Sequence, residues 1–205
     1  MSRVQQAGLT ALLAFCIAAS TGCAPQEPYN KKHYILRAER QGQPLADGTG
    51  KVLEVRHFTI DSAFSGRGLV YRTGPLRYDT DFYNEFLASP EVMIADKVRH
   101  WMAESELFKR VVEGGSYTEP THVLEANVIA LYGDFRDRAA PEAVLKMRIF
   151  VLDMTSDDAP EVVFGETYEV SHRIEGGDPD GVVAAMDACL VRILRSLESD
   201  LAKAL

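Results

Sequence analysis

The sequence predicts a single α+β domain, with two main helices packed on one face of a mostly antiparallel β-sheet, preceded by a cleaved signal segment. Three segments after residue 120 alternate apolar and polar side chains, as half-buried strands do. Two other segments repeat apolar residues every three or four positions, as helices covering a sheet do. About 170 residues follow the signal segment and its tether, a length that suits one domain with its own core.

Residues 1–22 have the three parts of a secretory signal peptide. Arg3 is the one charged residue before Cys23, residues 7–19 form an uncharged and mostly apolar run, and small residues lead to the junction. The run is too short for a permanent membrane helix, which needs about 20 apolar residues. We therefore expect cleavage between Gly22 and Cys23.

The motif Thr21-Gly22-Cys23 resembles the bacterial lipobox, whose cysteine receives diacylglycerol on sulfur before cleavage and an acyl chain on its new amino group. Ser20 departs from the leucine that the lipobox prefers at this position. We predict lipidation of Cys23, and no other cofactor. A plain export signal cut near Ala19, or an anchor that is never cut, are the alternatives.

Charge and cysteine usage narrow the function classes. Without Arg3, 21 basic residues face 30 acidic ones, a net charge of −9. An acidic chain with no basic stripe argues against nucleic-acid binding and against direct adhesion to anionic headgroups, so attachment must come from the acyl chains. Cys189 alone remains free, so no internal disulfide can form; we expect it to be a small buried side chain.

The first half of the chain predicts strands, a hairpin and helical segments. Residues 24–32 are a polar, proline-bearing tether, and the domain spans 33–205. Strand signals at 33–38 and 52–58 precede a hairpin, in which β-prone segments at 69–72 and 76–78 flank Thr73-Gly74-Pro75. Apolar residues at helical spacing predict helix over 79–87.

Residues beyond 88 predict two helices and three long strands. Ser89 as N-cap and Pro90 at the first helical position begin a helix that runs to about residue 104, followed by an edge-like strand at 107–112. Strands at 124–132, 143–151 and 162–170 have short polar connections, which favour an antiparallel meander. Asp178 and Pro179 begin the last helix.

No catalytic or metal-binding constellation is visible in the sequence. The five histidines are scattered without the spacing of a zinc site. There is no nucleophile elbow and no phosphate-binding loop, and Gly66-Arg67-Gly68 is too short to be a nucleotide fingerprint. We therefore predict a non-enzymatic protein.

Aromatic and arginine side chains are dense between residues 67 and 86. The plain interpretation is core packing, with salt bridges from the arginines to Asp79, Asp81 or Glu85. The sharper hypothesis is a partner-contact surface, because tyrosine and arginine are enriched at protein interfaces. The candidates for such a contact are Arg67, Tyr71, Arg72, Arg77, Tyr78, Phe82 and Tyr83.

An ordered set of short motifs resembles the ABC-type transport auxiliary lipoprotein family, whose best-known member is paraquat-inducible protein C. The resemblance covers essentially the whole mature chain, and Phe86 stands where such proteins often carry tryptophan. After the lipobox, the motifs are Tyr34-x-Leu36, a strand with Val55 and Phe58, Leu69-Val70-Tyr71-Arg72, Asp81-x-Tyr83, Phe86 with Ser89-Pro90, and residues 107–112.

This resemblance implies a lipoprotein on the periplasmic face of the outer membrane. It would dock the periplasmic MCE-domain protein of an ABC transport system that moves phospholipids between the inner and outer membranes. A homo-oligomeric ring is one way to match another ring. Ala24 is consistent with a location in the outer membrane, because an aspartate at this position commonly retains lipoproteins in the inner membrane.

Two other functions stay open on the sequence. One is a stand-alone periplasmic lipoprotein that binds lipid or another ligand in an apolar pocket. The other is a structural envelope module, akin to the N-terminal domain of TolB-like proteins, in a secretion or cell-wall complex. Neighbouring genes for an MCE protein, a permease and an ATPase would favour the transport function.

Overall fold

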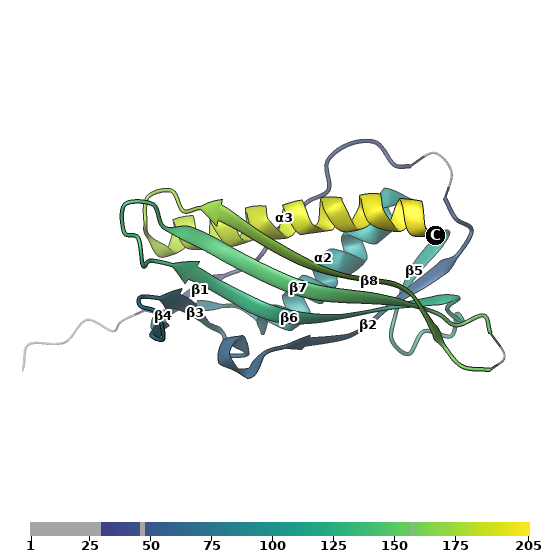
Figure 1. Cartoon of the computed structure of the whole chain (residues 1–205), viewed down its shortest axis with the longest axis horizontal. Helices are drawn as coiled ribbons and strands as arrows, with labels where there is room; N and C mark the ends of the chain where they lie inside the picture. The colour runs from purple at the N-terminus through teal and green to yellow at the C-terminus, as the bar shows by residue number, and fades with distance from the viewer. Residues whose placement is uncertain (1–29, 46–47, 157) are drawn as a thin grey trace, which may run out of the picture. The chain divides into compact units, whose positions relative to one another are not determined.

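Three long strands form the centre of the molecule. They are β6 (His122–Asp134), β7 (Glu142–Asp153) and β8 (Glu161–Arg173), and they pair as the antiparallel meander expected from their alternation (Figure 1).

The computed structural model describes residues 30–45, 48–156 and 158–205. The predicted signal peptide, Cys23 and most of the tether lie outside these residues.

The other side of β6 is shared by two strands. Strand β2 (Val52–Ile60) runs parallel to its first half and β3 (Gly68–Arg72) runs parallel to its end. The remaining strands extend these two: β5 (Arg110–Glu113) pairs parallel with β2, β4 (Tyr78–Phe86) pairs antiparallel with β3, and β1 (Lys32–Tyr34) pairs parallel with β4. The sheet is therefore mixed and curled, although its longest pairings are antiparallel.

Helices α2 (Pro90–Ser105) and α3 (Pro179–Ala204) lie on the same face of this sheet (Figure 1). This confirms the single α+β domain with two main helices on one face. The Asp178 carboxylate caps α3 by accepting a hydrogen bond from the backbone nitrogen of Gly181 at 2.8 Å. Ser89 occupies the N-cap position of α2, but its side chain makes no capping hydrogen bond. No helix within the described residues is long and apolar enough to cross a bilayer.

The core lies between the helices and the inner face of the sheet. One buried cluster joins α2, α3 and the inward residues of β6 and β7. Cys189 belongs to it, fully buried as expected, and burial raises the pKa of its thiol to about 11. Glu198 of α3 ties three segments together, because it accepts hydrogen bonds from Trp101 Nε1 of α2 at 2.6 Å and from Arg40 Nη2 at 2.8 Å.

The helix predicted over 79–87 is wrong, since this segment forms strand β4. A wide bulge explains the misleading spacing. Val70 of β3 pairs with Thr80, whereas Gly68, two residues earlier, pairs with Glu85. The extra residues around Asp81 shift the alternation of inward and outward side chains along β4. The aromatic residues Phe82, Tyr83 and Phe86 therefore recur at the spacing expected of a helix.

Candidate contact surfaces

The seven candidate contact residues fall into three environments. Tyr71 points toward the helix-covered side of the sheet. Arg72 and Tyr78 lie on the opposite, outer face, beside Arg77 in the hairpin turn. Arg67, Phe82 and Tyr83 surround the pairing of β1 with β4. The structure thus does not place the seven on a single surface.

Tyr71 is half-buried and serves as a positioning residue. Its ring contacts Phe135 edge-on at 5.6 Å, beside a shallow apolar cleft of about 200 Å³ at the start of α3. Its hydroxyl donates a hydrogen bond to Asp81 Oδ2 at 3.0 Å. Burial and the neighbouring carboxylate raise the pKa of Tyr71. The hydroxyl therefore stays protonated as a donor.

Asp81 organises the bulge in β4. Its Oδ1 accepts hydrogen bonds from the backbone nitrogens of Tyr83 and Asn84 at 2.8 and 3.0 Å, and its Oδ2 accepts one from the Asn84 amide at 2.9 Å. Burial alone would raise the pKa of Asp81, but the hydrogen bonds from Asn84, Tyr83 and Tyr71 outweigh it and lower that pKa. The turn held in this way leaves Phe82 68% exposed.

The second environment is an aromatic cluster on the outer face, which we call the hairpin cluster: Phe64, Arg72, Leu76, Arg77, Tyr78 and Tyr132. The Phe64 and Tyr132 rings stack at 5.9 Å and Tyr78 meets Tyr132 edge-on at 5.5 Å. The Arg72 guanidinium lies 5.6 Å from the Tyr78 ring centre, and donates a hydrogen bond to the Pro75 carbonyl. Leu76, at the tip of the turn, is 96% exposed.

The third environment is the β1–β4 patch: Lys31, His33, Ile35, Arg67, Phe82, Tyr83, Glu85 and Leu87. Glu85 is its centre, because Lys31 Nζ at 3.2 Å, His33 Nε2 at 3.1 Å and Arg67 Nη2 at 2.9 Å all reach its carboxylate. The hydrogen bond from Lys31, with the charge of Arg67, lowers the pKa of Glu85. The salt-bridge interpretation thus holds for Arg67, and for Arg77, whose Nε lies 4.0 Å from Asp79.

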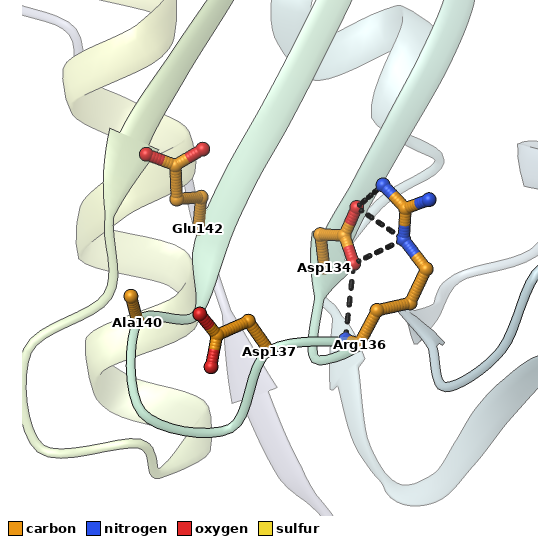
Figure 2. Close-up of a pocket in the computed structure, with 5 residues that line it drawn as sticks. All are labelled: Asp134, Arg136, Asp137, Ala140 and Glu142. Carbon is orange, nitrogen blue, oxygen red and sulfur yellow. Dashed lines mark hydrogen bonds and ion pairs between the residues drawn. The ribbon is translucent and has the colours of Figure 1, made fainter.

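A polar cleft of about 500 Å³ lies at the turn between β6 and β7. Figure 2 shows the Arg136 guanidinium turned onto the Asp134 carboxylate, with Asp137 on the loop beyond and Glu142 at the start of β7. The hydrogen bonds from Arg136 lower the pKa of Asp134. The cleft is acidic and its arginine is already paired, which disfavours an anionic ligand there. Within the described residues, no group of three histidine, cysteine or acidic side chains could hold a metal ion.

Sequence reasoning missed several members of these surfaces. Lys31, Ile35 and Leu87 join the patch through the pairing of β1 with β4, two segments about fifty residues apart that share no local pattern. Leu76 was included in the hairpin but not among the contact candidates. One signal was available, because the aspartate of Asp81-x-Tyr83-Asn84 can bond the backbone two and three residues ahead, as aspartates in turns do.

The chain is similar to one protein family and to several solved structures. The family model described as "ABC-type transport auxiliary lipoprotein component" matches residues 34–198. No curated protein matches the sequence. The crystal structure of a Xanthomonas campestris protein is similar over 82% of this chain and 91% of its own, with 16% identity and a TM-score of 0.64. A hypothetical protein from Chlamydia trachomatis is 11% identical, with a TM-score of 0.55 over 76% of this chain and 98% of its own. Both likenesses show the fold.

Proposed function

Because the chain belongs to the family of ABC-type transport auxiliary lipoprotein components, we propose that it is the docking subunit of an MCE-type transporter. This transporter moves phospholipids between the inner and outer membranes. The acyl chains on Cys23 hold the subunit to the periplasmic face of the outer membrane. The folded domain meets the periplasmic MCE protein, and a ring of identical subunits would match the symmetry of an MCE ring.

The hairpin cluster is the surface that supports docking best. Interface hot spots are rich in tyrosine and arginine held in well-packed surroundings. Tyr78 and Arg72 have such surroundings. The Tyr78 ring packs against Phe64 and Tyr132, and the Arg72 guanidinium lies over the rings of Tyr78 and Tyr132. Leu76 projects from the same turn as an apolar side chain with little of its surface covered. Preorganised side chains lose less conformational entropy when a partner binds.

The role is mechanical rather than catalytic. ATP hydrolysis would belong to the transporter's own ATPase subunit, and this chain would hold the far end of the MCE assembly in register with the outer membrane. A stand-alone carrier of lipid has weaker support. The apolar cleft beside Tyr71 holds about 200 Å³, whereas pockets for small molecules usually enclose about 300–1,000 Å³.

Photocrosslinking in intact envelopes tests the proposal. A photoreactive amino acid replaces Leu76 in one variant and Tyr117 in a control, a fully exposed aromatic in the loop between β5 and β6. We expect an MCE-domain protein to be captured from position 76 and not from position 117. Capture of a secretion or cell-wall protein instead would favour a structural envelope module. Co-purified phospholipid on a monomer without an MCE partner would favour a carrier.

A matched pair of variants gives an independent readout. Leu76→Asp with Arg77→Glu alters the hairpin turn without replacing the packed rings. The control pair, Tyr117→Asp with Arg110→Glu, introduces the same two acidic residues and the same change in charge at exposed positions elsewhere. The first pair should lower recovery of the partner in a pull-down at least tenfold and the second should leave it unchanged. Equal recovery with both pairs, from folded proteins, would contradict docking through this cluster.

A further inference from the structure

We propose that the β1–β4 patch rests on the headgroup layer of the bilayer that holds the lipid anchor, and so sets the orientation of the domain. The inference rests on the proposed lipid anchor at Cys23, but it concerns a different part of the molecule. The acyl chains provide attachment, since two or more are embedded in the bilayer. The patch decides which side of the domain faces the membrane.

The patch is formed by the outer faces of two paired strands. His33 pairs with Glu85 and Tyr34 with Phe86. Tyr34 and Phe86 are buried toward the helices, so their neighbours Ile35 and Leu87 point outward, 50% and 59% exposed. The backbone nitrogen of Leu87 donates to the Tyr34 carbonyl at 2.8 Å, which continues the pairing beyond the strand ends. Two apolar side chains therefore stand together on the surface.

Aromatic side chains extend this apolar surface. The bulge held by Asp81 projects Phe82, whose ring meets Tyr83 edge-on at 5.2 Å. Lys31 Nζ lies 4.5 Å from the centre of the Phe82 ring. An aromatic ring beside a lysine is the arrangement that interfacial membrane anchors use, with the ring at headgroup depth and the amine among the phosphates.

The local charge of the patch is opposite to that of the chain. Among the members of the patch, Lys31 and Arg67 give two positive charges against the one negative charge of Glu85. The mature chain as a whole carries −9. The sequence shows no basic stripe because positions 31 and 67 are far apart, yet the fold brings both to one carboxylate. Anionic headgroups are attracted to such a cluster, while they are repelled by the acidic remainder.

The tether brings this patch to the membrane before any other part of the domain. Seven residues, Ala24 to Asn30, separate Cys23 from Lys31, the first residue of the patch. The eight Cα–Cα steps from Cys23 to Lys31 span at most about 28 Å when fully extended. The lipidated cysteine therefore keeps Lys31 and its neighbours close to the bilayer surface. This continuity, together with the charge, identifies the membrane as the occupant.

A fluorescence experiment on the lipidated, mature protein tests the inference. Its Cys23 sulfur carries lipid and Cys189 is buried, so one added cysteine can be labelled selectively. Leu87→Cys places a polarity-sensitive dye in the patch, and Tyr117→Cys places it in the β5–β6 loop. The protein is bound to vesicles of phosphatidylethanolamine and phosphatidylglycerol that contain headgroup-labelled quencher lipid.

We expect quenching at position 87 to exceed that at position 117 at least threefold. Adding Lys31→Glu and Phe82→Ser should abolish this difference, while the protein still floats with the vesicles. Equal quenching at both positions, or none at either in protein that floats, would overturn the patch as a membrane contact and leave the anchor intact. Failure of the protein to float would overturn the anchor itself, and with it this inference.

Discussion

The Tyr71 hydroxyl donates a hydrogen bond to the Asp81 carboxylate at 3.0 Å, and this contact links the helix-covered side of the sheet to the bulge that exposes Phe82. Tyr71 packs against Phe135 and so is fixed by the core. Asp81 in turn fixes the backbone of Tyr83 and Asn84. The aromatic residues of the β1–β4 patch are thus held in place from inside the domain.

Replacement of Asp81 should loosen the bulge. Asp81→Ala removes the acceptor for two backbone nitrogens, the Asn84 amide and the Tyr71 hydroxyl, and we expect a loss of about 1–3 kcal/mol in the free energy of unfolding. Asp81→Asn keeps one acceptor oxygen for the backbone and should lose less. Urea unfolding measures both, and hydrogen exchange of residues 81–84 should speed up in the alanine variant alone. Unchanged exchange there would contradict the role given to Asp81.

The ion pair between Arg40 and Glu198 should be far more sensitive than the pairs at the surface. Both side chains are largely buried, and Glu198 also accepts from Trp101. Glu198→Ala leaves the buried Arg40 guanidinium without its counter-charge, with only the carbonyls of Gly42 and Gln43 as acceptors, and it leaves the Trp101 indole nitrogen without its acceptor. We therefore expect a cost of about 3–5 kcal/mol in the free energy of unfolding. Lys203→Ala, which breaks the exposed pair with Asp200, should cost under about 1 kcal/mol. Similar costs for the two variants, measured by urea unfolding, would argue against this ranking.

Local patterns in the sequence predicted the elements whose environment is regular, and failed where a distant segment sets the environment. The meander of β6 to β8 follows from plain alternation, and α3 from its apolar stripe with the Asp178 cap. The strand β4 was mistaken for a helix because the bulge at Asp81 breaks its alternation. The parallel pairings of β2 and β3 with β6 have no signature within either strand alone.

The contact surfaces show the same limit. The density of aromatic residues and arginines marked the segment 67–83 as a candidate contact. It could not show that Tyr71 turns inward while Tyr78 turns outward, since this depends on which face α3 covers. Nor could it join Arg67 to Lys31, which meet at Glu85 through strand pairing.

The thiol of Cys189 should be inert in the folded protein. It is fully buried, and its pKa is raised to about 11, so little thiolate forms at pH 8. A thiol reagent should therefore fail to modify Cys189 in buffer and should modify it once urea unfolds the chain. Rapid reaction in buffer would contradict its placement in the core.

Stability should fall with acid because of His122. Burial, reinforced by the charge of Lys51 and opposed by Asp153, lowers the pKa of His122 below its ordinary 6.5. Below about pH 6.5 the His122 side chain takes up a proton more readily in the unfolded chain than in the folded one. Its contribution to the free energy of unfolding is therefore fully present above that pH and is lost as the pH falls. His122→Leu should flatten the dependence of the urea midpoint on pH between pH 7.5 and 5. An unchanged slope in the His122 variant would contradict this assignment.

A docking subunit held to the outer membrane requires acylation of Cys23, and the intact mass of the protein extracted from envelopes tests this most directly. We predict a chain that begins at Cys23 and carries a diacylglyceryl group on sulfur and an acyl chain on its amino group. Cys23→Ser should yield no acylated species. A mature chain that begins before residue 23, or one with an unmodified Cys23 thiol, would contradict the lipid-anchored function.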